Sequence, residues 1–318
     1  MDKPFIIAGN EILPGTEISL KLPVSRLPSG NQINIHAHIY RSDKPGPVLL
    51  LLAGMHGDEI NGIEIVRRSI ESGLFSELNR GSVIAIPLLN VYGFINFSRD
   101  AVNGKDVNRS FPGSASGSMA SRVASVLTRH ILPYVDYGLD FHTGGQSRFN
   151  LPQVRYSPKD LRSSDLAKAF NALVRIEKPT IPKSFRRSCL DAGIPAIVFE
   201  GGEALRLDEF SVSEGIRGIK RILHHLEMKS YPIPGNISVN IKKSAWKRAS
   251  TAGVFTALRV AGDQVRAGEV IGTIKDPYGF NQLSIKSSHT GIIICHNNHP
   301  VVYPGDPLFN IGFEISRD

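Results

Sequence analysis

The run "PVLLLLAG" at residues 47–54 limits the fold more than any other part of the sequence. Its side chains are apolar on both faces, so it predicts a strand buried on both sides, as in a parallel sheet covered by helices. The polar segment "MHGDE" follows directly, at residues 55–59. Side chains in that position lie at the carboxyl edge of the sheet, where open α/β sheets bind ligands.

Apolar strands and amphipathic helices alternate along the chain after residue 46. This alternation predicts an α/β fold, with a mostly parallel or mixed central sheet flanked by helices. Besides the opening run, we expect strands at 82–90, 137–145 and 194–202, and helices at 58–72, 119–132, 160–173, 186–192 and 207–228.

The two ends of the chain have a different texture. Residues 1–43 alternate polar and apolar side chains and predict antiparallel strands. After the proline-bracketed "YPIPGN" at 231–236, short strand patterns are separated by Gly and Pro turns, which predicts an all-β region. Its Gly-Asp repeats resemble the barrel-sandwich fold of biotinyl and lipoyl carriers. We therefore predict one domain over 1–235 and a small C-terminal β domain over 236–318.

Composition excludes several classes of protein. The net charge is +8, but the basic residues are scattered and form no basic helix or zinc finger, so we expect no nucleic-acid partner. The N-terminus lacks a secretory signal and no window approaches the roughly 20 apolar residues of a membrane span, which predicts a cytoplasmic protein. The 2 cysteines are too few for a disulfide framework. A homo-oligomer stays open.

Three polar side chains at the predicted sheet edge suit a metal ion. His56 and Glu59 lie three positions apart at a strand-to-helix junction, where both can point the same way. His142 stands at the carboxyl end of a later buried strand, and Asp140 two residues earlier could orient an imidazole. Two histidines and one glutamate are a known ligand set for catalytic zinc. We therefore predict a zinc site formed by His56, Glu59 and His142.

Further polar groups could complete such a site. Glu200 ends the apolar strand "AIVFEGG", where its carboxylate would face the same edge as a general base. Helix capping is the alternative role, and Glu203 fits it better because it lies closer to the next helix. The loop between 90 and 118 offers Arg99, Asn108 and Arg109, which could hold a carboxylate or an oxyanion, or could simply face solvent.

Five motifs together resemble one family. "GMHGDE", "NVYGF", "KDVNRSFPG", "DFHTGG" and "FEGG" occur in the order typical of the succinylglutamate desuccinylase and aspartoacylase family, which is related to the zinc carboxypeptidases. The resemblance implies a zinc-carboxypeptidase-like fold with a C-terminal β domain. It also implies that one zinc ion per chain is bound by His56, Glu59 and His142.

The same resemblance implies roles for other residues. Glu200 would be the general base and then the general acid. Arg99 would polarise the scissile carbonyl, while Asn108 and Arg109 would hold a substrate carboxylate. The chain departs from the family pattern at Asp58, where aspartoacylases have Asn.

These features together predict a zinc-dependent amidohydrolase. Its substrate would be a small, anionic N-acyl amino acid or a related N-acyl amine. One alternative is a zinc metallocarboxypeptidase that trims peptides. Another is a non-catalytic protein that uses the β domain for binding.

Other histidines carry no such prediction. His36 and His38 have the His-x-His spacing of amidohydrolase barrels, but we expect them at the surface of an edge strand. We interpret "CHNNH" at 295–299 as a β turn. The sequence contains no nucleophile elbow, no P-loop and no strand-linked Gly-x-Gly-x-x-Gly, which disfavours a serine hydrolase, a nucleoside triphosphatase and a dinucleotide-binding enzyme.

Overall fold

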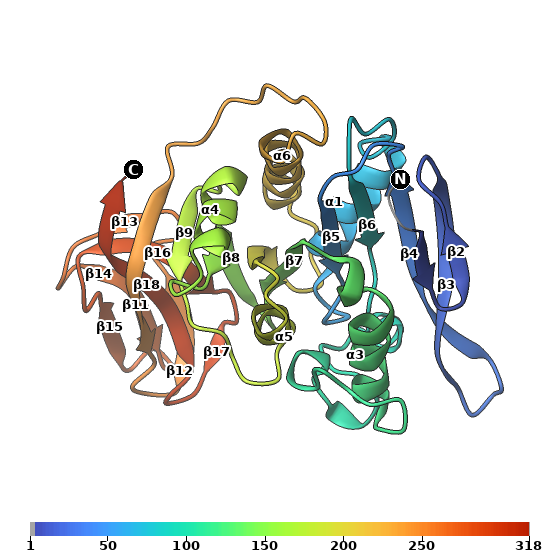
Figure 1. Ribbon diagram of the computed structural model, residues 1–318. Helices are drawn as coiled ribbons and strands as arrows, with labels where there is room; N and C mark the ends of the chain where they lie inside the picture. Colours follow the sequence, from blue (N-terminus) through green and yellow to red (C-terminus); the bar gives the residue numbers. More distant parts are fainter. Residues whose placement is uncertain (1–3, 318) are drawn as a thin grey trace.

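One mixed sheet of 12 strands runs through the computed structural model, which describes residues 4–317 (Figure 1). In chain order, and counting strands both inside and outside this sheet, the first ten strands are β1 (Phe5–Ile7), β2 (Asn10–Ile12), β3 (Glu17–Arg26), β4 (Gln32–Arg41), β5 (Val48–Ala53), β6 (Ser82–Ile86), β7 (Tyr137–Gly144), β8 (Arg148–Tyr156), β9 (Val174–Glu177) and β10 (Ala196–Glu203). The helices are α1 (Ile60–Glu71), α2 (Val91–Ile95), α3 (Met119–His130), α4 (Leu161–Phe170), α5 (Phe185–Asp191) and α6 (Glu209–His225).

The C-terminal part consists of eight further strands. They are β11 (Val239–Arg248), β12 (Gly253–Ala257), β13 (Gln264–Val265), β14 (Val270–Lys275), β15 (Gln282–Lys286), β16 (Gly291–Asn297), β17 (Val301–Val302) and β18 (Pro307–Arg317). The order of the large sheet is β13-β16-β18-β11-β9-β8-β10-β7-β5-β6-β4-β3. β1 and β2 form a separate hairpin, and β15-β14-β12-β17 form a sheet of 4 strands.

The middle of the large sheet is parallel, as the apolar run predicts. β5 pairs in parallel with β6 and β7, and β7 pairs in parallel with β10. Leu50 and Leu52 of β5 belong to the core under α3 and α5, whereas Leu49 and Leu51 belong to the core under α1, α4 and α6. Figure 1 shows these two groups of helices on opposite faces of the sheet. Because both faces are covered, β5 has to be apolar at every position.

Two glycines let α6 pack closely on its neighbours. A Cβ atom on Gly215 would lie 2.3 Å from Ile65 Cδ1 of α1, and one on Gly218 would lie 2.1 Å from Phe170 Cζ of α4. Real Cβ atoms do not approach other heavy atoms so closely, so these positions admit only glycine without rearrangement.

The predicted helices and central strands are present, but β8 and β9 are absent from the sequence prediction. β8 lies antiparallel beside β10 and so interrupts the parallel order. Its sequence, "RFNLPQVRY", alternates polar and apolar residues on either side of Pro152, but the proline interrupts this alternation and weakens the strand pattern. The mixed sheet flanked by helices agrees with the predicted fold class.

One local prediction is wrong in part and another is wrong. His36 is exposed and His38 is half-buried, as expected for surface histidines, but they do not lie on an edge strand, because β4 pairs with β3 on one side and with β6 on the other. His38 Nδ1 lies 2.8 Å from Ser19 Oγ of β3. The segment "CHNNH" is not a β turn, since residues 295–297 belong to β16.

The C-terminal strands join the large sheet at two places. β11 pairs in parallel with β9, and β16 pairs with residues 148–150 of β8. The 4-stranded sheet packs over this end of the large sheet around a core that includes Phe255, Ile271 and Phe309. No helix within residues 4–317 is long and apolar enough to cross a membrane.

We expect Gly218→Ala to destabilise the protein. The added methyl group would press on the ring of Phe170, and overpacking of this kind costs about 1–3 kcal/mol. Chemical denaturation measures the change in the free energy of unfolding. His225→Ala, at an exposed position of the same helix, is the control and should change it by less than about 0.5 kcal/mol. Equal effects of the two variants would contradict this packing argument.

Candidate metal centre

The turn after β5 brings His56 and Glu59 to the edge of the sheet. Gly57 lies against the backbone of α2, where an added Cβ atom would stand 2.0 Å from Gly93 C and 2.0 Å from Phe94 N. The turn therefore requires glycine between the two polar residues. Glu59 is the N-cap residue of α1, but its side chain caps no backbone N–H of that helix, so its carboxylate is available to other groups.

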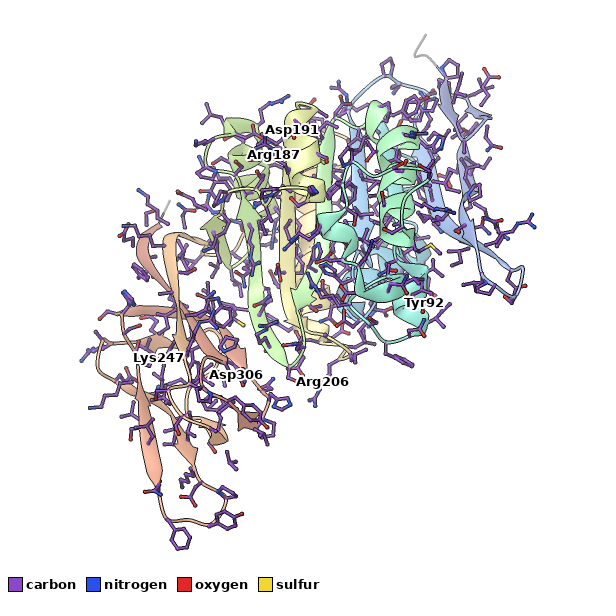
Figure 2. All side chains as sticks on the ribbon, turned by 90° about the horizontal axis from the view of Figure 1, so that it is seen from below. Tyr92, Arg187, Asp191, Arg206, Lys247 and Asp306 are labelled. Carbon is purple, nitrogen blue, oxygen red and sulfur yellow. The ribbon has the colours of Figure 1, made fainter. Side chains whose placement is uncertain are left out.

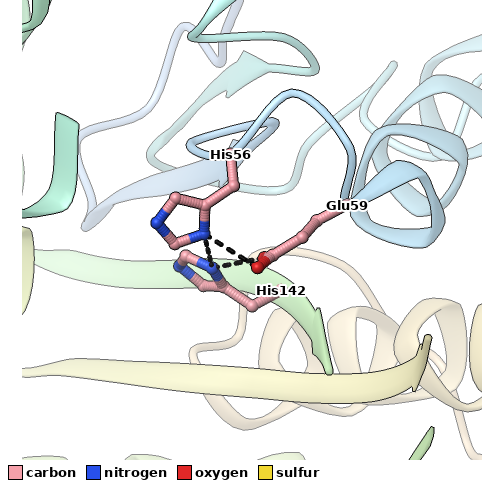
Figure 3. Close-up of side chains that lie close together, drawn as sticks. All are labelled: His56, Glu59 and His142. Atoms are coloured by element: carbon pink, nitrogen blue, oxygen red, sulfur yellow. Dashed lines mark hydrogen bonds and ion pairs between the residues drawn. The ribbon is translucent and has the colours of Figure 1, made fainter. Parts of the chain in front are cut away.

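His56, Glu59 and His142 form one buried group (Figure 3). Glu59 Oε1 lies 2.8 Å from His56 Nδ1, and Glu59 Oε2 lies 2.7 Å from His142 Nδ1. The two Nδ1 atoms are 3.2 Å apart. One potential ligand atom of each residue lies within 4.8 Å of the others, so the structure brings together the three side chains predicted to bind metal.

The far nitrogens of both imidazoles face carboxylates. His142 Nε2 lies 2.8 Å from Asp140 Oδ2, and His56 Nε2 lies 3.2 Å from Asp106 Oδ1. An Nε2–H that donates to a carboxylate leaves the lone pair on Nδ1, which points into the three-residue group. Two imidazole nitrogens and one carboxylate then fit zinc. Asp140 thus lies where it can orient the His142 imidazole, in agreement with the prediction from its position two residues before His142.

The charges in and around the group together outweigh the large effect of burial on the pKa values of His142 and Glu59. Burial would lower the pKa of His142, but the carboxylates of Asp140 and Glu59 outweigh burial and hold this pKa well above its usual value. Burial would raise the pKa of Glu59, but the two imidazoles outweigh it and hold this pKa well below its usual value. The group therefore favours bound positive charge, and a divalent cation can take the place of the imidazole protons.

Arg99 lies directly against the three-residue group. Its Nη1 lies 3.1 Å from Glu59 Oε1 and 3.1 Å from His56 Nδ1, and its Nη2 donates to Asp106 Oδ2 at 3.0 Å. Asn90, the N-cap of α2, holds the start of this loop by donating to Arg99 O at 3.4 Å. The Arg99 guanidinium therefore lies where it could donate to the oxygen of a carbonyl placed next to the three-residue group.

Glu200 lines a cavity that is also lined by the three-residue group and Arg99, but its carboxylate has partners of its own. Its Oε1 lies 2.7 Å from Arg155 Nη1, and its Oε2 accepts a hydrogen bond from Asn150 Nδ2 at 2.7 Å. The prediction that Glu203 caps the next helix is wrong, because Asp208 is the N-cap of α6. Glu203 instead pairs with Arg206 and accepts a hydrogen bond from Asn298.

The predicted carboxylate-binding pair lies at the mouth of the cavity. Asn108 and Arg109 both line it, and Arg109 is exposed. Asn108 Oδ1 accepts a hydrogen bond from Phe185 N at 2.9 Å, which anchors the loop to α5. Arg109 Nη1 donates to Asn108 O at 2.7 Å.

The cavity is small and rich in arginine. Its volume is about 310 Å³, and its lining contains five arginines, which are Arg99, Arg109, Arg148, Arg155 and Arg186. Burial, followed by the charge of Arg155, lowers the pKa of Arg186 to about 10. Such a lining attracts anions.

Several lining residues are absent from the sequence prediction. Arg148 and Arg155 lie on β8, and Trp246 and Cys295 reach the cavity from β11 and β16 of the C-terminal part. Figure 2 shows the C-terminal strands, marked by Lys247 and Asp306, alongside the end of the central sheet where Arg206 lies. The polar and apolar alternation within "RFNLPQVRY" was the available signal for β8. No motif indicates where the C-terminal strands attach.

The protein is therefore an α/β protein with a mixed sheet, a potential metal-binding His-Glu-His group at the carboxyl edge of that sheet, and an attached C-terminal β region. A model of the succinylglutamate desuccinylase/aspartoacylase catalytic domain matches residues 45–226. The chain therefore belongs to this family, and the family predicted from the sequence motifs is confirmed.

Individual relatives agree with this assignment. The chain is 27% identical over 307 residues to N-alpha-acetyl-L-2,4-diaminobutyric acid deacetylase from Halomonas elongata, covering 91% of this chain and 89% of the relative. A succinylglutamate desuccinylase/aspartoacylase from Rhodobacter sphaeroides has a TM-score of 0.83 and 26% identity, covering 93% of this chain and 94% of that one. The product-bound ectoine utilization protein EutE (DoeB) from Ruegeria pomeroyi shares the fold, with a TM-score of 0.84, 22% identity and coverage of 98% and 99%.

We expect Asp140→Asn to weaken metal binding. The change removes the charge that accepts the His142 Nε2–H, and loss of such a supporting carboxylate typically lowers metal affinity about 10- to 100-fold. Competition with a chelator of known zinc affinity measures the effect. Asp191→Asn, in an ion pair on α5, is the matched control and should leave metal affinity unchanged (Figure 2). Unchanged affinity in Asp140→Asn would contradict the role of Asp140.

Proposed function

We propose that this protein is a zinc-dependent amidohydrolase that removes the acyl group from a small N-acyl amino acid or a related N-acyl amine. His56, Glu59 and His142 would hold one zinc ion per chain. The observation that carries the proposal is the convergence of these three buried side chains beside Glu200 and Arg99 in one cavity. Family membership and the deacetylase name of the Halomonas elongata relative support it.

Zinc held by His56, Glu59 and His142 would supply Lewis-acid chemistry, which lowers the pKa of a water and polarises a carbonyl. Glu200 accepts a proton from the attacking water and passes it to the leaving nitrogen. Arg99 donates hydrogen bonds to the carbonyl oxygen as negative charge develops there. One water is consumed, and a carboxylic acid and an amine are released.

The remaining residues would bind and orient the substrate. Arg109 and Asn108 would hold a substrate carboxylate at the mouth of the cavity, which fixes the amide bond relative to Glu200. A volume of about 310 Å³ is at the lower end of the range for small-molecule sites, about 300–1,000 Å³, and so favours an acyl amino acid over a peptide. The arginine-rich lining favours an anionic substrate.

We also propose that the chain consists of two domains. Residues up to 235 would form a zinc-carboxypeptidase-like catalytic domain, and residues from 236 onward a barrel-sandwich-like β domain. The separate hydrophobic core of the C-terminal strands supports this division.

We expect Glu200→Gln to retain zinc and lose turnover. The amide keeps the shape of the side chain but cannot accept the proton, and loss of a general acid–base typically costs about 10²- to 10⁴-fold in rate. Elemental analysis of the purified protein, together with assays on N-acetyl and N-succinyl amino acids, measures both quantities. Glu71→Gln, at an exposed position of α1, is the control and should behave as the unchanged protein.

A metal-ligand variant gives the complementary result. His56→Ala should lose both zinc and turnover, because the remaining two donors cannot hold the ion tightly. Full activity of Glu200→Gln would remove Glu200 from the mechanism, and full activity of zinc-free His56→Ala would contradict the proposed function.

We expect Arg109→Ala to impair only substrates with a free carboxylate. Loss of a charge-assisted hydrogen bond should raise KM for an N-acetyl amino acid about 10- to 100-fold. The matching carboxamide substrate should be hydrolysed equally by both proteins. Lys105→Ala removes an exposed cation from the same loop and serves as the control. Equal losses on the acid and on the carboxamide would contradict carboxylate binding by Arg109.

A further inference from the structure

Two side chains of β8 hold both carboxylate oxygens of Glu200. Arg155 Nη1 lies 2.7 Å from Oε1, and Asn150 Nδ2 donates to Oε2 at 2.7 Å. The side chain of Glu200 is largely buried, whereas about a third of the Arg155 side chain is exposed. The carboxylate therefore has a fixed orientation before any substrate arrives.

An irregularity in the strand pairing makes this arrangement possible. In the register of β10 with β8, Glu200 lies opposite Gln153 and Gly202 lies opposite Asn150, so β8 uses one residue more than β10 over this stretch. In a regular strand, residues 150 and 155 would face opposite sides of the sheet. The extra residue turns Asn150 to the side of Arg155, and the two then flank Glu200.

The C-terminal part supports the same stretch of β8. Cys295 of β16 pairs with Asn150, and the Gln153 side chain donates to Ile294 O at 3.3 Å. These contacts fix the irregular segment from the side opposite β10. The attachment of the C-terminal strands therefore stabilises the position of Asn150.

Arg186 and Lys178 lie close enough to Arg155 for charge repulsion, and a carboxylate partner for Arg155 offsets this repulsion. Burial, followed by the charge of Arg155, lowers the pKa of Arg186 to about 10, and the same two causes lower the pKa of Lys178. Like charges so close repel one another, and Glu200 is the carboxylate that pairs with Arg155. The ion pair is thus favoured over a conformation in which Arg155 turns away.

We propose that Arg155 and Asn150 are positioning residues that act through Glu200 and set its orientation for proton transfer. This inference rests on the proposed function. Arg155 and Asn150 do not belong to the His-Glu-His group, so their proposed role is exerted through Glu200 and not through the metal ligands.

A double-mutant cycle on the zinc-loaded protein tests the proposal. Arg155→Met should lower kcat about 10- to 100-fold and change KM less than about 3-fold, because the substrate still binds while its base is misplaced. Arg155→Lys should recover part of kcat. In the Glu200→Gln background, Arg155→Met should cost less than about 2-fold more, since a residue that acts through Glu200 has nothing left to position.

The control is Arg187→Met, which removes a guanidinium from the ion pair with Asp191 on α5 and should leave kcat unchanged (Figure 2). Urea denaturation of the zinc-free proteins gives a second readout that does not depend on activity. The midpoint of Arg155→Met/Glu200→Gln should be no lower than that of the less stable single variant, because both changes remove the same ion pair.

Several outcomes would overturn the proposal, and they can be distinguished. Unchanged kcat in Arg155→Met with an inactive Glu200→Gln would overturn the role of Arg155 alone. Additive losses in the double variant, with a raised KM, would show that Arg155 contacts the substrate directly. Full activity in Glu200→Gln would overturn the proposed function itself, and with it any role exerted through Glu200.

Discussion

The carboxylate of Glu59 between two imidazoles is the interaction on which the rest of this structure depends. A buried carboxylate is costly unless a positive charge or several donors accompany it. Here His56 and His142 lie within 2.8 Å of its two oxygens, and Arg99 approaches one of them at 3.1 Å. Because the carboxylate charge of Glu59 and one nitrogen of each imidazole converge on one point, the arrangement suits a divalent cation held at the end of an apolar sheet.

The architecture serves this point of convergence. Parallel pairing of β5, β7 and β10 brings the ends of three strands together, and these strands deliver or precede His56, His142 and Glu200. Neither histidine depends on a long flexible loop for its position. The loop that carries Arg99, Asn108 and Arg109 is instead tied to the scaffold through Asn90 and through Phe185 N.

The sequence predicted the central sheet and the three convergent side chains because these features depend on local patterns. A strand that is apolar at every position, such as β5, has one place in an α/β fold, and polar residues at its end have one edge to occupy. β8 could not be predicted in the same way, because its antiparallel position depends on long-range pairing and Pro152 weakens its pattern. The partners of Glu200 were hidden for that reason. The contribution of Trp246 and Cys295 depends on how the C-terminal strands attach, which no motif indicates.

Diffraction from crystals of the zinc-loaded protein, measured on both sides of the zinc absorption edge, tests the central claim most directly. We expect one anomalous peak per chain, surrounded by His56 Nδ1, a carboxylate oxygen of Glu59 and His142 Nδ1. A peak at another place, or one that contacts fewer than these three side chains, would contradict the account of the metal centre.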